Sequence, residues 1–398
     1  MIDKPAILGG SPLFEEFLPI VRPTLPNYKT VEARVAELFA TGMVTKGKYL
    51  AEFERRVAEY LGVKHAVAVS SCTTGLLLSY QGLGLDGEVI VPSFTFMATV
   101  HPLALNGVTP VFVDVDAETW NIDPRRVVEA ITPKTTAIVA LHNFGNPADV
   151  EELVSIAETH GLKLVIDAAH GFGTLYKGEP VGRYGDAEVF STSPTKLLVT
   201  GEGGVVATDD DELARKIRVG REYGNPGSYD SEFPGINARM QEFSAILGLE
   251  GLAMLEENAQ RRNRLADRFR KRLGRLPGIC FQKINSHNRS SYKDFSVAID
   301  ENAFGLSRDQ LSEALRAEGV DSRKYYDPPV HLHTAYRDFL QRCQGKLPVT
   351  ESLARRILSL PIYSHMDDDT VDRICLAVER IQLHAGDVRR SLTQEERS

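Results

Sequence analysis

The sequence of 398 residues has no long hydrophobic run, because no stretch reaches the roughly 18 apolar residues of a membrane-spanning helix. Basic residues are not in excess either: 46 Lys and Arg stand against 54 Asp and Glu, a formal net charge of −8. Nucleic acid or an anionic membrane would require a concentrated basic surface, so we expect neither as a main partner. The N-terminus leads into mixed sequence without an apolar signal core, and we therefore expect a cytoplasmic protein.

Cysteine is also scarce. Cys72, Cys280, Cys343 and Cys375 stand in unrelated contexts and lack metal-ligand spacing. This predicts reduced thiols rather than a disulfide framework, and no zinc or other metal site. The remaining composition, 42% hydrophobic and 25% charged, is that of a globular chain with two or three domains and a large core. Any anionic substrate must therefore be held by local charges.

Short β-like runs alternate with helical patterns between about residues 65 and 210. This alternation is typical of a three-layer α/β domain whose mainly parallel sheet is covered on both faces. The seven predicted strands are 66–69, 88–91, 110–113, 137–140, 162–166, 187–190 and 204–207. In such sheets ligands collect beyond the carboxyl ends of the strands. The candidate residues expected at that edge are 70–74, 92–96, His142, Asp167 and Ser191.

The rest of the chain predicts a smaller α+β domain. Residues 240–275 have the pattern of one long amphipathic helix that links the two domains. The elements expected after it are a strand at 295–299, helices at 309–318 and 368–383, and a charged tail at 387–398 that frays. We predict a large domain over 1–250 and a small C-terminal domain over 251–398.

Lys196 is the most informative residue, because of its surroundings. It closes the polar run 191–196, the glycine-rich turn 201–204 follows, and Asp167 ends an apolar run 29 residues earlier. An amine that can form a Schiff base, a carboxylate that can keep a pyridine nitrogen protonated and the Ser191 hydroxyl for a phosphate are groups that pyridoxal phosphate (PLP) needs. Taken singly, Lys196 would be a solvated charge and Asp167 a helix cap. Together they predict a PLP site in which both are catalytic.

Three further segments fit the same cofactor. Residues 70–75 lie between a strand and an apolar helix, where amides and hydroxyls form either an anion site or an ordinary helix cap. Phe96, in a second such turn, is either a ring that stacks on a flat cofactor or a core residue. His170 follows Asp167 by three residues and is either a cofactor contact or a structural histidine. The turn 201–204 allows close backbone approach behind Lys196.

These segments, in this order, resemble the sugar-nucleotide aminotransferases of the DegT/DnrJ/EryC1/StrS family, within the type I fold of PLP-dependent transferases. The resemblance covers almost the whole chain. The matching segments are 45–48, 52–54, 235–240 and 358–361, together with those around Ser70, Pro92, Asp167 and Lys196.

The resemblance implies a role for each matching residue. Lys196 binds the cofactor covalently, Asp167 pairs with its pyridine nitrogen, and Phe96 stacks on its ring. His170 lies near the phenolic oxygen. The residues implied to hold the phosphate are Cys72 (by its amide), Thr73 and Ser191, with Asn237 reaching it from the neighbouring subunit of a homodimer.

The implied reaction is a two-step transamination from L-glutamate to a keto sugar nucleotide. The candidates to bind the diphosphate are Arg239, Arg323, Lys324 and His331, and the alternative for each is a solvated surface charge. Lys196 counts against a dehydratase of the family, in which histidine takes its place. A non-catalytic regulatory or binding paralogue, expected to lose Lys196 or Asp167, stays the alternative from another class.

Two departures from the commoner family pattern blur the sugar specificity. Residues 192–195 are Thr-Ser-Pro-Thr where an aromatic and a small apolar residue are usual, and position 170 is His where many members have Gln. The segment 168–170 is similar to that of members that aminate carbon four. We therefore favour dTDP-4-keto-6-deoxyglucose as the acceptor. Amination of a 3-keto isomer is the alternative.

Overall fold

The larger sheet is the centre of the fold. The computed structural model describes residues 3–337 and 347–395. The sheet has seven strands in the order β1-β9-β8-β5-β4-β2-β3, and β9 runs opposite to the rest. The strands are β1 (His65–Val69), β2 (Glu88–Pro92), β3 (Thr109–Val113), β4 (Thr135–Leu141), β5 (Lys163–Ala168), β8 (Ala187–Ser191) and β9 (Gly204–Thr208). The predicted seven-stranded, mainly parallel sheet is confirmed.

Helices cover both faces of this sheet, because the side chains of each strand alternate between two hydrophobic clusters. On β5, Leu164 and Ile166 lie in one cluster and Val165 in the other. The first face is covered by α1 (Tyr28–Thr41), α2 (Lys48–Leu61), α5 (Pro124–Ala130), α6 (Val150–His160) and α8 (Glu242–Ala253). The second face is covered by α3 (Cys72–Gly82), α4 (His101–Leu105) and α7 (Asp211–Gly220). The domain therefore has the three layers expected.

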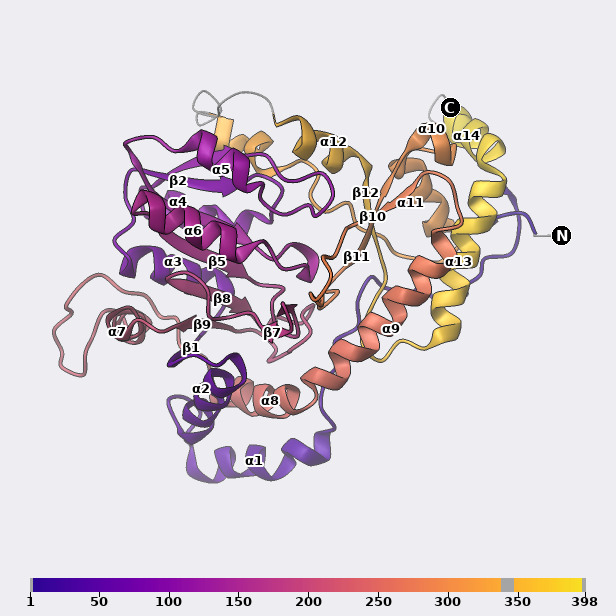
Figure 1. The fold of residues 1–398 in the computed structure, drawn as a ribbon. Helices are drawn as coiled ribbons and strands as arrows, with labels where there is room; N and C mark the ends of the chain where they lie inside the picture. The colour runs from indigo at the N-terminus through magenta and orange to yellow at the C-terminus, as the bar shows by residue number, and fades with distance from the viewer. Residues whose placement is uncertain (1–2, 338–346, 396–398) are drawn as a thin grey trace.

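A second, antiparallel sheet lies beside the first (Figure 1) and consists of β10 (Ile279–Phe281), β11 (Phe295–Ile299) and β12 (Ile357–Leu360). The helices of this region are α9 (Leu255–Leu273), α10 (Glu301–Phe304), α11 (Arg308–Ala317), α12 (Pro348–Arg356), α13 (Asp368–Leu383) and α14 (Ala385–Glu395). Phe14 and Leu18, near the start of the chain, lie in the same cluster as α9, α11 and α13. The division at residue 250 stays a prediction.

The short elements lie between these helices and strands. They are η1 (Ala6–Leu8), η2 (Met97–Thr99), η3 (Asn143–Gly145), η4 (Val330–Leu332), and the paired strands β6 (Leu175–Tyr176) and β7 (Glu179–Pro180). The turn η3 is unusual because Phe144 at its centre has a φ of 57°, in the left-handed region. Both η2 and η3 follow strands of the large sheet and stand near its carboxyl edge.

The prediction of one helix over 240–275 is wrong in one respect. The helix is divided at Met254 into α8 and α9, whose axes meet at an angle in Figure 1. The Met254 N–H donates to the carbonyl of Gly251 at 3.2 Å, three residues back, and so ends the α-helical pattern. The change of direction lets α8 and the start of α9 (Leu255, Ala259) pack on the first face of the large sheet. The rest of α9, from Leu265 to Leu273, packs in the cluster that also contains Phe14 and Leu18.

The prediction that the tail from residue 387 frays is also wrong for the described part. Residues up to 395 form α14, because Val388 and Leu392 bury their side chains in the cluster that contains Phe14, Leu18 and residues of α11 and α13. Residues 396–398 lie outside the described residues. The apolar spacing of four residues on a mostly charged segment was the signal that the composition obscured.

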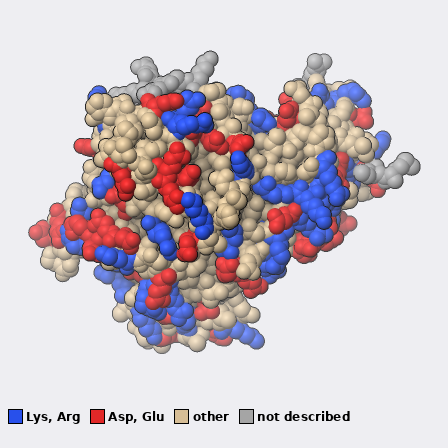
Figure 2. Space-filling view, viewed as in Figure 1, with Lys and Arg blue, Asp and Glu red and all other residues tan. Residues whose placement is uncertain are grey.

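Many charged side chains of the described residues form ion pairs. Figure 2 shows Lys and Arg gathered over α9, and there Arg268 pairs with Asp368 and Asp372 while Arg272 pairs with Glu379. Over the described residues, no helix is long and apolar enough to cross a membrane. Of the cysteines, Cys72, Cys280 and Cys375 are free thiols, and Cys343 lies outside the described residues.

Candidate active site

A cavity of about 390 Å³ opens at the carboxyl edge of the large sheet, between that sheet and the second one. Its lining comes from both parts of the chain: Ser71, Cys72, Thr73, Phe96, Ala98, Asp167, Ala169, His170, Ser191, Ser193, Thr195, Lys196, Glu202, Gly203, Lys293, Asp294, Tyr325 and Tyr326. All the residues predicted to contact the cofactor, except Asn237, meet here. Parallel strands end at one edge, so side chains far apart in sequence converge.

Asp167 is the buried carboxylate of the cavity. It stands near the end of β5, where Oδ2 accepts a hydrogen bond from the Thr99 hydroxyl at 2.7 Å and Oδ1 accepts one from the Ala169 N–H at 3.0 Å. Burial raises the pKa of Asp167, and these hydrogen bonds together with the charge of Lys196 oppose the rise. A cationic partner in the cavity would complete the neutralisation of this carboxylate.

Lys196 supplies an amine to the same cavity. Lys196 lies in the turn after β8, where its backbone N–H donates to the carbonyl of Ser193 at 3.0 Å. Burial lowers the pKa of Lys196 to about 8, and the positive charge of Lys293 adds to the effect. A lysine with this pKa is partly neutral near pH 8, and the neutral amine is the form that attacks a carbonyl carbon.

The turn behind Lys196 requires glycine, as the sequence indicated. A Cβ placed on Gly203 would lie 2.5 Å from Oγ1 of Thr192, and one on Gly204 would lie 2.6 Å from the amide nitrogen of Cys72. Both distances are too short for any side chain. The absence of side chains therefore lets β9 run close behind the first turn of α3.

The first turn of α3 is the anion site. The Ser71 hydroxyl accepts a hydrogen bond from the Thr74 N–H, and the Thr74 hydroxyl accepts one from the Ser71 N–H. No described residue accepts a hydrogen bond from the N–H groups of Cys72 or Thr73. Such N–H groups and the helix dipole favour a phosphate. Burial raises the pKa of the Cys72 thiol well above its usual range, so the sulfur stays neutral and the amide is the part suited to an anion.

Phe96 and His170 complete the walls. Phe96 is half exposed and precedes η2, and its ring is accessible from the cavity. His170 accepts a hydrogen bond from the Phe144 N–H on Nδ1, at 3.1 Å. Burial lowers the pKa of His170 well below its usual range, so its ring is neutral. The cavity thus contains an amine, a carboxylate and a set of N–H donors, the groups that fit PLP.

Sequence reasoning missed the contribution of the second sheet. Lys293 and Asp294 form an ion pair with both Nζ–Oδ distances 2.9 Å, and Lys293 also lies over the ring of Tyr325 with its Nζ 5.1 Å from the ring centroid. The available signal was a charged dipeptide between the aromatic residues Tyr292 and Phe295, next to a buried strand. Thr99, which holds Asp167, carried no signal beyond its place after Phe96.

Five predicted residues do not line this cavity. Asn237 is exposed, and Arg239 lines a separate cavity of about 530 Å³, where it pairs with Glu222 at 2.9 Å. That cavity is larger but contains neither Lys196 nor Asp167, so the smaller one is the better candidate. The other three residues have partners elsewhere: Arg323 with Asp321, Lys324 with Asp309, and the buried His331 with Ser93.

Comparison with known proteins decides between the family reading and its alternatives. Residues 27–379 match the model of the DegT/DnrJ/EryC1/StrS aminotransferase family. The chain belongs to this family. Its curated relatives include the spore coat polysaccharide biosynthesis protein SpsC of Bacillus subtilis, 36% identical over 92% of this chain and 97% of the relative. They also include the dTDP-4-amino-4,6-dideoxy-D-glucose transaminase of Escherichia coli, 33% identical over 90% of this chain and 97% of the relative.

Solved structures agree with this membership of the DegT/DnrJ/EryC1/StrS family. The crystal structure of DesI, described in the presence of its TDP-sugar product, has a TM-score of 0.91 and 38% identity, and the match covers 100% of both chains. The protein is therefore a PLP-dependent sugar aminotransferase, and a sugar nucleotide is its class of substrate. The predicted family, activity and cofactor are confirmed, while the roles of individual residues stay predictions.

Proposed function

We propose that this enzyme transfers the amino group of L-glutamate to carbon four of dTDP-4-keto-6-deoxyglucose. The observation that carries the proposal is one cavity whose lining includes both the Lys196 amine, with its lowered pKa, and the buried Asp167 carboxylate. The name of the Escherichia coli relative and the TDP-sugar product of DesI support the nucleotide and the carbon. A cytoplasmic location stays a prediction.

When bound, PLP supplies a carbonyl carbon for amines and a ring that withdraws electrons. Lys196 would hold the cofactor through its amine, because its lowered pKa leaves a nucleophilic fraction near neutral pH. Once displaced by the amino donor, the same amine would move a proton at the substrate carbon. Asp167 would keep the pyridine nitrogen protonated, and the N–H groups of Cys72 and Thr73 with the Ser191 hydroxyl would hold the phosphate.

One cofactor contact, Asn237, and one substrate contact, Arg239, would come from a second subunit. Asn237 and Arg239 follow the segment that projects from the body between α7 and α8 in Figure 1, and neither lines the Lys196 cavity of its own chain. A symmetric homodimer would bring this segment to the partner's cavity. Arg323, Lys324 and His331 each have a polar partner in their own chain, as Arg239 has in Glu222, so each would exchange that partner for the diphosphate on binding.

The regiochemistry is tested with two acceptors. The enzyme, first converted to its aminated form by L-glutamate and then desalted, is offered the 4-keto and 3-keto dTDP sugars separately, and the products are analysed by mass spectrometry and NMR. We expect faster amination of the 4-keto sugar. Faster conversion of the 3-keto sugar would favour the alternative carbon. Failure of both would point to a different acceptor, and failure of the glutamate step would point to another donor or a non-catalytic role.

A further inference from the structure

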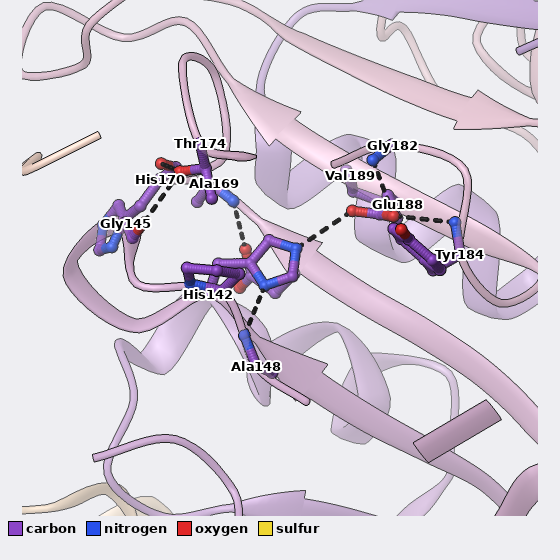
Figure 3. Close-up of polar contacts among 12 residues, drawn as sticks. His142, Gly145, Ala148, Ala169, His170, Thr174, Gly182, Tyr184, Glu188 and Val189 are labelled. Carbon is purple, nitrogen blue, oxygen red and sulfur yellow. Dashed lines mark hydrogen bonds and ion pairs between the residues drawn. The ribbon is translucent and has the colours of Figure 1, made fainter. Parts of the chain in front are cut away.

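A fully buried histidine and glutamate form a pair beside the cavity and have no part in the chemistry described above. Nε2 of His142 lies 3.2 Å from Oε2 of Glu188, and neither side chain is exposed. The other carboxylate oxygen of Glu188 accepts hydrogen bonds from the N–H groups of Gly182 and Tyr184, at 2.8 and 2.9 Å (Figure 3). Burying ionisable groups costs free energy, so the pair calls for a specific role.

The hydrogen bonds define which nitrogen of His142 carries the proton. The Ala148 N–H donates to Nδ1 at 3.1 Å, so the ring proton is on Nε2, and this Nε2–H donates a hydrogen bond to Oε2 of Glu188 (Figure 3). The His142 ring therefore makes one hydrogen bond to Ala148 and another to Glu188 of β8. The ring therefore closes the segment 142–148, which contains η3, into a fixed loop.

Phe144 lies in the middle of this loop, where its ring packs against other aromatic rings and its backbone adopts a left-handed conformation. Its ring stacks on Tyr326 at 5.7 Å between centroids and meets Phe94 and Trp120 edge to face at 6.1 and 6.3 Å. Its backbone has a φ of 57°, which a residue with a side chain adopts only where the surroundings hold it. In this conformation the Phe144 N–H is directed at Nδ1 of His170.

The hydrogen bond from the Phe144 N–H determines the tautomer of His170. Because Nδ1 accepts the Phe144 N–H, the proton of the neutral ring is on Nε2. No described residue hydrogen-bonds to that Nε2, and His170 lines the cavity. Its carbonyl is fixed by the hydroxyl of Ser291 at 2.7 Å, so the backbone of this residue is also anchored.

We propose that His142 and Glu188 are positioning residues which, through the loop 142–148 and the Phe144 N–H, hold His170 as the Nε2–H tautomer with that N–H available to an acceptor in the cavity. That the acceptor is the phenolic oxygen of PLP rests on the proposed function. The tautomer itself does not, because every contact behind it lies within the protein.

The tautomer is measured in the cofactor-free protein labelled with 15N-histidine, by long-range 1H–15N correlation. The His170 signal is assigned as the one lost in His170→Gln. We expect the wild type to show a single Nε2–H form, and the Nδ1–H form would overturn the proposal. In His142→Gln we expect both tautomers at His170, with the fold verified by circular dichroism. His160→Gln, a change at an exposed histidine at the end of α6, should leave the His170 signal unchanged.

A second variant and a second readout separate positioning from stability. Glu188→Gln keeps the size of the side chain but replaces one of its two acceptor oxygens by an NH2 donor. The side chain then cannot accept hydrogen bonds from His142 and from the Gly182 and Tyr184 N–H groups at once, and we expect the same mixture of tautomers. A folded variant with an unchanged His170 signal would overturn the proposal. With PLP bound, the pH midpoint of the visible absorption should move by about one unit in both variants. A changed tautomer without this shift would contradict only the placement of His170 at the cofactor.

Discussion

The hydroxyl of Thr99 donates a hydrogen bond to Oδ2 of Asp167 at 2.7 Å. The Thr95 hydroxyl lies 2.6 Å from the same Thr99 hydroxyl. Two hydroxyls of the segment after β2 are therefore hydrogen-bonded in series to the carboxylate. The Ala169 N–H occupies the other oxygen of Asp167. The carboxylate is thereby fixed in orientation before any cofactor arrives, and such preorganisation is the largest single contribution to catalysis in many enzymes.

Replacing Asp167 by Asn should preserve the fold but lower kcat by about 100- to 1000-fold, because an amide cannot stabilise a protonated pyridine nitrogen. Steady-state kinetics and thermal unfolding measure the two effects. The matched change Thr99→Val removes only one hydrogen bond to the carboxylate and should cost about tenfold. Near-normal turnover in Asp167→Asn would show that this residue is only structural.

Lys196 should be the residue that binds the cofactor covalently. Borohydride treatment of the loaded enzyme, followed by peptide mapping, should place the pyridoxyl label on Lys196, because burial lowers its pKa to about 8 while Lys293, which also lines the cavity, is held in an ion pair with Asp294. Lys196→Ala should give no label and no turnover. Lys293→Met, a change in the same cavity, should leave the label on Lys196. A label on a different lysine would refute the assignment.

The rate at which cofactor-free enzyme takes up PLP should depend on pH through Lys196. The protonated amine does not react, so the rate should rise with pH through a midpoint at about 8 and reach a plateau at higher pH. Removing the nearby positive charge in Lys293→Met should move the midpoint to higher pH, since repulsion from Lys293 helps to lower the pKa. Lys283→Met, at an exposed lysine paired with Glu118, is the control and should not move it. A midpoint that stays near 8 in Lys293→Met would contradict this explanation.

Shared sites in a homodimer are tested by mixing two defective subunits. Lys196→Ala should be inactive, and Asn237→Ala should be impaired in binding the phosphate. In a hybrid dimer, one site would combine the intact Lys196 of one subunit with the intact Asn237 of the other. We expect the hybrid to recover about half of the wild-type activity per dimer, because one of its two sites is complete. Activity no greater than that of the Asn237→Ala dimer would argue against shared sites, and sedimentation should show a dimer.

The sequence alone determined the large sheet and the core of the site. The strands are short β-branched and alanine runs, each bounded by turns, so their periodicity is visible without tertiary information. Parallel strands place their carboxyl ends at one edge, which is why Asp167, Ser191 and the Lys196 turn could be brought together from order in the chain. The anion site at Cys72 and Thr73 follows from a local rule too, since a polar cap marks the start of a helix.

Only the tertiary structure decided what faces these residues. Lys293, Asp294, Tyr325 and Tyr326 enter the cavity from much further along the chain. The charged dipeptide 293–294 beside a buried strand is visible in the sequence, but nothing local shows that it faces Lys196. The pKa of Lys196 depends on that wall, because burial and the charge of Lys293 are properties of the assembled cavity. Arg239 shows the converse: a basic residue is a candidate ligand in sequence, but its place in a different cavity of its own chain and its pairing with Glu222 emerge only when the chain is packed. Local periodicity thus determines the strands and helices, while long-range packing determines the pKa values and the contacts of the side chains at the site.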